Sequence, residues 1–234
     1  MSKFKISGLQ KLTLLDFPGY VACTVFTNGC NMRCPFCHNA SLVVRADVQE
    51  EYNMEELFSF LKKRTGLLEG VAITGGEPTL YSGLDDFIKR VRELGYKVKL
   101  DTNGTRPSIL KSLIDDNLLD YVAMDIKNCR EKYGKTIGLG DSFDLSPIEE
   151  SKNILMSGKV DFEFRTTVAN PLHQKDDFYK IGEWLQGNEK YFLQQFKDSG
   201  DIIGNQISAY SEAEMEEFIN ILKSFVPNAQ IRGV

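Results

Sequence analysis

Short apolar runs recur along the chain, and each is bounded by glycine, proline or charged residues. Their brevity and their content of Val, Ile, Phe and Tyr favour β-strands covered on both faces. The predicted strands span residues 21–26, 70–74, 97–101, 121–125, 161–168 and 191–196.

Between these runs, apolar residues follow the three- and four-residue spacing of amphipathic helices. Asn53 and Ser211 are predicted N-caps, each with a glutamate three residues later, and Gly95 is a predicted C-cap. The predicted helices span residues 54–63, 84–94, 107–115, 146–156, 176–185 and 211–225.

The alternation of strands and helices predicts an α/β fold with a parallel sheet and right-handed crossovers. About six strand–helix units are too few for the closed eight-stranded barrel. They fit a partial (βα)6 barrel that is open on one side, while a flat doubly wound sheet is an alternative that local patterns do not exclude. We expect one domain over residues 1–234, comprising an N-terminal hairpin extension (1–20, with the hairpin in 3–16), a βα core (21–200) and a C-terminal helix and tail (201–234).

The composition is that of an ordinary folded protein, with 42% hydrophobic and 26% charged residues. The net charge of −5 argues against nucleic-acid binding. No apolar run approaches the ~20 residues of a membrane span. The N-terminus lacks the apolar core of a signal peptide, so we expect a cytoplasmic protein with reduced thiols.

Three cysteines, Cys30, Cys34 and Cys37, stand at C-x3-C-x2-C spacing directly after the first strand of the core. Three thiolates can converge on one metal centre and leave one metal position open, whereas closed zinc sites and fully protein-ligated [4Fe–4S] clusters use four ligands. The alternative is a zinc knuckle that adds His38, although adjacent residues rarely bind one tetrahedral ion. Incidental thiols are a further alternative. Cys23 and Cys129 are expected to be buried thiols rather than ligands.

Further polar residues fall at the carboxyl ends of predicted strands, where parallel α/β folds place their sites. Gly75, Gly76 and Glu77 end the second strand of the core, and the two glycines allow close approach of the backbone to a ligand. Asp101 and Asp125 end the next two strands and form an oxygen-ligand pair for a hard cation. Ordinary turn chemistry is the alternative for all of these positions.

Arg165 lies within an otherwise apolar strand, where an unpaired charge would be costly. By strand alternation, Glu163, Arg165 and Thr167 share one face, which we expect to line the barrel interior. A structural pair between Glu163 and Arg165 is the alternative to a role in the site. His173 is expected to be a loop residue.

The cysteine spacing resembles the signature of the radical S-adenosylmethionine (SAM) superfamily. The wider string of residues 12–39, with Asp16-Phe17-Pro18-Gly19 before the cysteines and Cys37-His38-Asn39 closing them, is similar to the activases of glycyl-radical enzymes. Among these it resembles the anaerobic ribonucleoside-triphosphate reductase activating proteins. The resemblance extends to about residue 170.

The resemblance implies that Cys30, Cys34 and Cys37 hold a single [4Fe–4S] cluster. It implies SAM contacts from Asn39, Gly75, Gly76, Glu77, Asp101, Asn103, Asp125, Lys127 and Arg165. It also implies a monovalent-cation site formed by the side-chain oxygens of Asp101 and Asp125 and the backbone carbonyls of Thr102 and Met124. The chain departs from some activases at Gln194-Gln195, where they place a histidine near the adenine of SAM, so Gln195 is only a weak candidate for that contact.

The implied reaction is reductive cleavage of SAM to a 5′-deoxyadenosyl radical, which removes a hydrogen atom from a glycine of a partner enzyme. The expected partners are an anaerobic ribonucleotide reductase and a low-potential electron donor such as flavodoxin or ferredoxin. One alternative is a radical SAM enzyme acting on a small molecule, similar to 7-carboxy-7-deazaguanine synthase. The other is a zinc-binding interaction module.

Overall fold

The computed structural model describes residues 2–45 and 51–233. Its main feature is an eight-stranded sheet with the strand order β10-β9-β8-β7-β6-β4-β3-β2. The strands are β2 (Gly8–Thr13), β3 (Ala22–Thr27), β4 (Gly70–Gly75), β6 (Lys97–Thr102), β7 (Tyr121–Asp125), β8 (Asp161–Val168), β9 (Tyr191–Gln195) and β10 (Gln230–Arg232). All six predicted core strands are present, and β2 and β10 extend the sheet at its two edges.

The strand order runs in one direction from β3 to β10, and every pair in this stretch is parallel. A doubly wound sheet would reverse its order at a switch point, so that alternative is wrong. The edge strands β2 and β10 are not paired with each other, which leaves the sheet open. The fold is therefore the open α/β arrangement expected of a partial barrel.

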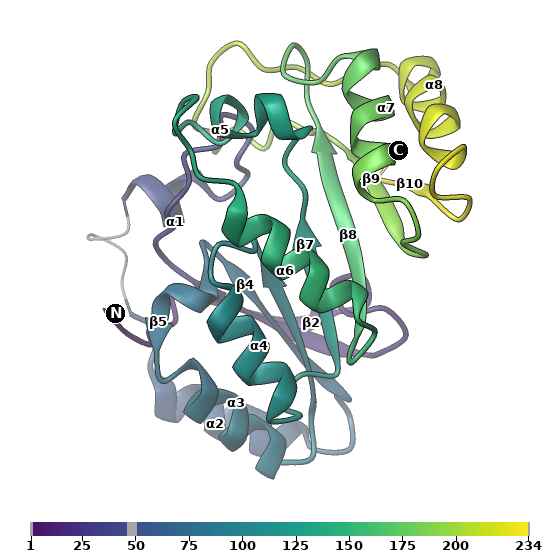
Figure 1. Ribbon diagram of the computed structural model, residues 1–234. Coiled ribbons are helices and arrows are strands. Elements are labelled where there is room, and N and C mark those ends of the chain that lie inside the picture. Colours follow the sequence, from purple (N-terminus) through teal and green to yellow (C-terminus); the bar gives the residue numbers. More distant parts are fainter. Residues whose placement is uncertain (1, 46–50, 234) are drawn as a thin grey trace.

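The helices connect successive strands, and Figure 1 shows α4 and α6 side by side along the sheet and α7 packed against α8. They comprise α2 (Met54–Arg64), α3 (Leu84–Glu93), α4 (Pro107–Asp115), α6 (Ser146–Met156), α7 (Lys175–Trp184) and α8 (Glu212–Lys223), with the short α1 (Ala40–Val44) and α5 (Tyr133–Thr136). The predicted caps at Asn53 and Ser211 form as side-chain hydrogen bonds to the first turns of α2 and α8. In the described part of the chain, no helix is long and apolar enough to cross a membrane.

The hairpin predicted within residues 3–16 is wrong. The strand β1 (Ser2–Lys3) pairs in parallel with the distant β5 (Tyr81–Ser82), whereas β2 pairs antiparallel with β3. The connection between β2 and β3, residues 14–21, is thus the hairpin turn. The error has a physical source, because the local sequence of a strand does not indicate which neighbour it pairs with.

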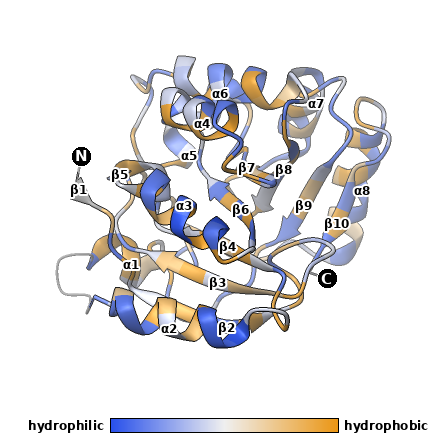
Figure 2. Cartoon of the chain, turned by 90° about the horizontal axis from the view of Figure 1, so that it is seen from below, coloured by the Kyte–Doolittle hydropathy of each residue, from blue (hydrophilic) through white to orange (hydrophobic). Residues whose placement is uncertain are grey.

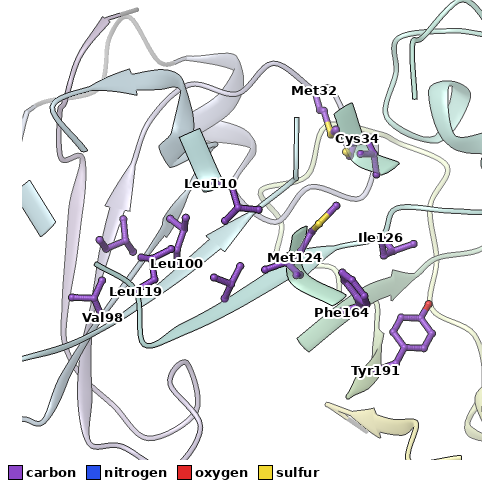
Figure 3. Close-up of a cluster of buried hydrophobic side chains, with 14 of the residues drawn as sticks. Met32, Cys34, Val98, Leu100, Leu110, Leu119, Met124, Ile126, Phe164 and Tyr191 are labelled. Atoms are coloured by element: carbon purple, nitrogen blue, oxygen red, sulfur yellow. The ribbon is translucent and has the colours of Figure 1, made fainter. Parts of the chain in front are cut away.

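The core lies between the sheet and its helices and continues beneath the cysteine loop. Figure 3 shows Leu100, Met124 and Phe164 from three adjacent strands in one cluster with Met32 and Cys34. In Figure 2, β3 is coloured as hydrophobic over most of its length, whereas α2 carries both hydrophobic and hydrophilic residues. The loop that carries the cysteines is therefore anchored in the hydrophobic core.

At the amino ends of the strands, Glu163 is buried and accepts hydrogen bonds from two partners. Both carboxylate oxygens accept from Arg232 (2.8 and 2.9 Å), and Oε2 also accepts from the Tyr121 hydroxyl (2.9 Å). The alternative pairing of Glu163 with Arg165 does not form. Glu163 instead ties the C-terminal strand β10 to the barrel.

Candidate functional site

The cysteine loop, residues 28–39, follows β3 and is fixed by backbone hydrogen bonds to three distant segments. The Gly29 N–H donates to Leu42 O (2.7 Å), and the Arg33 N–H donates to Ile137 O (2.8 Å). Pro35 O accepts from the Gly204 N–H (2.8 Å). The three cysteines are thus presented on a backbone whose course is set by the surrounding fold.

Gly75 and Gly76 bring the end of β4 against this loop. A Cβ on Gly76 would lie 1.8 Å from Gly29 O, and a Cβ on Gly75, which has a φ of +116°, would lie 2.2 Å from Thr27 O. The Gly76 and Glu77 N–H groups donate to Thr27 O (2.9 Å) and Gly29 O (2.8 Å). Both glycines are required by this close approach between two protein backbones.

The three thiols are largely buried, and burial is the main cause that raises their pKa values. The pKa of Cys30 is raised to about 11 and that of Cys34 to about 12, and the pKa of Cys37 is also raised. Such thiols become thiolates when a bound metal shares their charge. A donor set of three thiols on one loop fits a cluster in which each cysteine binds a separate iron.

His38 packs against a side chain outside the cysteine loop. Its ring stacks on Phe196, with centroids 5.4 Å apart and planes at 29°. Within residues 2–45 and 51–233, no three His, Cys, Asp or Glu side chains are grouped so that they could hold a single metal ion. The zinc-knuckle geometry of Cys30, Cys34, Cys37 and His38 is therefore not the arrangement that the structure adopts.

Glu77 is fully buried and connects the ends of β4 and β6. Its Oε1 accepts from the Thr79 N–H (3.1 Å) and the Thr102 hydroxyl (2.8 Å), and its Oε2 accepts from the Asn103 N–H (2.6 Å). Burial raises its pKa, and these hydrogen bonds offset the rise only in part. The carboxylate is directed at protein donors and holds two strand ends together.

Asp101 and Asp125 are joined by Arg165. The guanidinium lies 3.3 Å from Asp101 Oδ2 and 3.2 Å from Asp125 Oδ1. Lys99, itself buried, pairs with Asp101, and Lys127 lies 2.9 Å from Asp125. Burial alone would raise the pKa of each aspartate, but the adjacent cations outweigh it and hold both pKa values below their usual range.

Asn103 reaches from the end of β6 to the cysteine loop. Its Oδ1 accepts from the Thr105 N–H (3.0 Å), which fixes the orientation of the amide. Its Nδ2 therefore faces the loop, where it donates to Asn31 Oδ1 (2.9 Å) and lies 3.7 Å from Cys30 Sγ. Asn103 thus contacts a cysteine ligand in addition to lining the site.

These groups surround one cavity of about 200 Å³ at the carboxyl ends of the strands. It is lined by Cys30, Cys34, Cys37, Asn39, Gly75, Gly76, Glu77, Asp101, Thr102, Asn103, Asp125, Lys127 and Arg165. Of the predicted site residues, Met124 and the weak candidate Gln195 are not among its lining residues. The Met124 side chain is buried in the core, and the ligand predicted at that position is its backbone carbonyl. The individual roles of the lining residues stay predictions.

Sequence reasoning missed several lining residues, including Met32, Phe36, Thr167 and Gln194. Strand alternation placed Thr167 on the interior face, but it gave no reason to choose Gln194 over Gln195. Gln195, the weak candidate, donates to Tyr210 O (2.8 Å) and does not line this cavity.

His173 lies in the loop between β8 and α7, as expected, but it is fully buried behind the cavity. Its Nδ1 accepts from the Ala169 N–H (3.2 Å), which assigns the proton to Nε2, 2.8 Å from Lys127 O. Phe36 of the cysteine loop packs edge-on against its ring at 6.2 Å. A loop sequence has no periodic pattern from which this burial could be predicted. Cys23 and Cys129 are buried and do not line the cavity.

Comparison with known proteins agrees with this geometry. Residues 24–146 match the family model of the radical SAM superfamily. The chain is 30% identical over 242 residues to a protein of Methanocaldococcus jannaschii provisionally named glycyl-radical enzyme activating enzyme, covering 99% of this chain and 97% of that protein. It is also 30% identical over 129 residues to the pyruvate formate-lyase-activating enzyme of Clostridium pasteurianum, covering 53% and 52% of the two chains.

Among solved structures, a radical SAM methyltransferase from Sphaerobacter thermophilus has a similar fold, with a TM-score of 0.73 at 13% identity. The match covers 94% of this chain and 68% of the methyltransferase. The match to the family model, the full-length relative and the three-cysteine cavity at the strand ends lead to one conclusion: this chain belongs to the radical SAM superfamily.

Proposed function

We propose that this protein is an activase that uses SAM to remove a hydrogen atom from a backbone glycine of a partner enzyme. One observation carries the proposal: the three cysteines of one loop and the polar residues at the ends of β4, β6, β7 and β8 line a single cavity. The similarity to the M. jannaschii protein over nearly the full length of both chains supports the choice of activase within the superfamily.

In this proposal Cys30, Cys34 and Cys37 hold a [4Fe–4S] cluster, which when bound supplies the electron that cleaves SAM to methionine and a 5′-deoxyadenosyl radical. Buried Met32, Cys34 and Phe36 restrict water around the ligands. The backbone hydrogen bonds of the cysteine loop to Leu42, Ile137 and Gly204 keep the ligands in place before SAM arrives.

The charged residues are proposed to orient SAM. Lys99, Arg165 and Lys127 supply three positive charges against the two carboxylates of Asp101 and Asp125. Arg165 and Lys127 line the cavity and are the cations available to the carboxylate of SAM, and an acceptor is available at Gly75 O, where the Asn39 amide already donates (3.1 Å). Because these groups are already fixed by one another, SAM would bind to a preorganised wall.

The monovalent cation stays a prediction. Its two proposed carboxylate ligands already face three cationic side chains, so a further cation would have to displace Lys99, Arg165 or Lys127 from them. We therefore expect activity to change little when potassium is exchanged for sodium or choline. A strict requirement for one cation would contradict that expectation.

We propose an anaerobic ribonucleotide reductase as the partner and flavodoxin or ferredoxin as the electron donor. The support is the resemblance of residues 12–39 to the activating proteins of that reductase. The alternative partners are other glycyl-radical enzymes, and the experiment below tests whether the reductase is the partner.

The test is anaerobic reconstitution with iron and sulfide, reduction with dithionite in the presence of SAM, and chromatography for 5′-deoxyadenosine. We expect 5′-deoxyadenosine from the protein, and a glycyl radical in the reductase by electron paramagnetic resonance. A reconstituted protein that holds iron but forms no 5′-deoxyadenosine would refute the proposal. If 5′-deoxyadenosine forms without a radical in the reductase, the choice of partner is wrong.

A further inference from the structure

The cavity of about 200 Å³ that the three cysteines line is called the cofactor cavity below. A second and larger cavity of about 780 Å³, called the open cavity, lies beside it on the side where the sheet is not closed. The two cavities share four lining residues, His38, Arg165, Thr167 and Gln194. A molecule in the open cavity would therefore meet the cofactor cavity at these residues.

Thr167 and Gln194 are direct neighbours across β8 and β9, where the sheet register pairs them. Both are partly exposed and line both cavities. Across residues 2–45 and 51–233, neither the Thr167 hydroxyl nor the Gln194 amide makes a hydrogen bond or other polar contact. In contrast, the adjacent Arg165 is engaged on both sides by carboxylates. Polar groups that a ligand would cut off from water favour a ligand that satisfies them.

The chemistry of these two side chains matches a peptide group. A primary amide presents one acceptor and an N–H donor side by side, and a hydroxyl can donate or accept. A peptide group offers the complementary N–H and C=O, so Gln194 can contact it at two points and fix its orientation. Two-point contact is what the reaction requires, because a specific C–H bond of the substrate must face the radical.

The rim of the open cavity points to a macromolecular ligand. Leu14 and Leu15, in the connection between β2 and β3, line it with 69% and 88% of their surface exposed. A small molecule within the cavity would leave these side chains in water, whereas a protein segment that crosses the opening would cover them.

We propose that Thr167 and Gln194 bind the peptide backbone of an extended protein segment beside the glycine that loses its hydrogen atom, and that this segment enters across Leu14 and Leu15. The inference rests on the proposed function. In the step that it serves, a Cα–H bond of the glycine breaks and the hydrogen atom passes to the 5′ carbon. The products are 5′-deoxyadenosine and a glycyl radical, with no further reactant.

The experiment compares the reconstituted wild-type protein with Gln194→Glu, which keeps the shape but replaces the N–H donor with a negative charge. The matched control is Gln230→Glu, the same change at an exposed position on β10 that lines neither cavity. The measured quantity is the number of 5′-deoxyadenosine molecules formed per glycyl radical in the reductase. We expect a rise of at least tenfold in Gln194→Glu and the wild-type ratio in Gln230→Glu.

A ratio in Gln194→Glu equal to that of the wild type would overturn the inference, even if both rates fall together, because that result assigns Gln194 to the cofactor. A second measurement does not depend on the choice of partner. A short peptide with a central glycine that carries deuterium at Cα is the probe, and deuterium in 5′-deoxyadenosine is the readout. We expect transfer by the wild type and at least a fivefold smaller deuterated fraction in Gln194→Glu.

An unchanged deuterated fraction in the variant, or no transfer by a wild-type protein that cleaves SAM, would also overturn the inference. Failure of the proposed function is seen in the wild type alone, which would then form no 5′-deoxyadenosine or would form it without any hydrogen transfer from glycine. The inference about Gln194 fails separately when the wild type transfers hydrogen and Gln194→Glu transfers it equally well.

Discussion

The two walls of the cofactor cavity differ in how their polar side chains are satisfied. On the β4–β7 side, Glu77, Asp101 and Asp125 each meet protein donors or cations. On the β8–β9 side, Thr167 and Gln194 have no polar partner among the described residues. The first wall is fixed before any ligand binds, whereas the second gains its hydrogen bonds only when a ligand supplies them.

The strand β8 contains both kinds of polar side chain, those with protein partners and those without. Along its interior face, Glu163 is bound by Arg232 and Tyr121 at the amino end, Arg165 bridges two carboxylates in the middle, and Thr167 is unpartnered at the carboxyl end. The same face therefore passes from stabilising the fold, through organising the site, to a position open to substrate. Side chains saturated by the protein are expected to govern stability, and unsaturated ones to govern specificity.

The largest effect is expected from the cysteines. Cys30→Ala/Cys34→Ala removes two of the three thiols that would bind iron, so iron content and SAM cleavage should fall to background while the far-ultraviolet circular dichroism spectrum is retained. Cys23→Ala is the control, because Cys23 is buried in β3 outside the cavity and the brown cluster should persist. Wild-type turnover in the double variant would exclude the cluster site.

The bridge that Arg165 forms between Asp101 and Asp125 should affect both stability and activity. Arg165→Met leaves the partly buried Asp101 and Asp125 with one cation fewer, although Lys99 and Lys127 remain. The free energy of unfolding should therefore fall by an amount near the lower end of the ~3–5 kcal/mol typical of breaking a buried pair. Urea unfolding measures it, and SAM cleavage should fall with it. Unchanged values of both would show that the bridge does not form in solution.

The sequence predicted the elements of the fold better than their partners. Strands such as 161–168 and helices such as 107–115 were found because their periodicity is local. The short β10 escaped notice, since three residues carry no period, and the pairing of β2 with β3 depends on contacts that no local pattern encodes. Contacts between distant segments also explain why Glu163 pairs with Arg232 and Arg165 pairs with Asp101 and Asp125.

In the site, too, the sequence predicted local features but not contacts that form only after folding. The cysteine spacing and the aspartates at strand ends could be identified because their residue types are unusual at those positions. The choice between Gln194 and Gln195, and the burial of His173, depend on which way a side chain points after folding. An amide in a strand has no distinctive signal until its neighbours are known.

At the saturated amino end, a change should alter stability alone. Tyr121→Phe removes the hydroxyl that donates to Glu163 at 2.9 Å while Arg232 keeps the carboxylate paired. The free energy of unfolding should fall by about 1.5–3 kcal/mol, as expected for a hydrogen bond to a charged group. SAM cleavage should match the wild type, because Tyr121 lines neither of the two cavities. A loss of SAM cleavage without a loss of stability would contradict this division of roles.

The smallest effect is a pH dependence of the Arg165 bridge in the metal-free protein. The folded pKa values of Asp101 and Asp125 lie below 3.8, so these groups bind fewer protons in the folded than in the unfolded chain around that pH. Their contribution to stability is therefore fully present above about pH 4 to 5 and is lost as the pH falls through the folded pKa values. In Arg165→Met the two pKa values should rise, because the cation nearest to both carboxylates is gone. Urea unfolding at pH 7, 5 and 3 should then show a constant difference between wild type and variant at the two higher values and a smaller one at pH 3. If the difference in the free energy of unfolding stays constant down to pH 3, Arg165 stabilises the barrel through its packing. The positions of Asp101 and Asp125 would then be fixed by side-chain packing and not by charge.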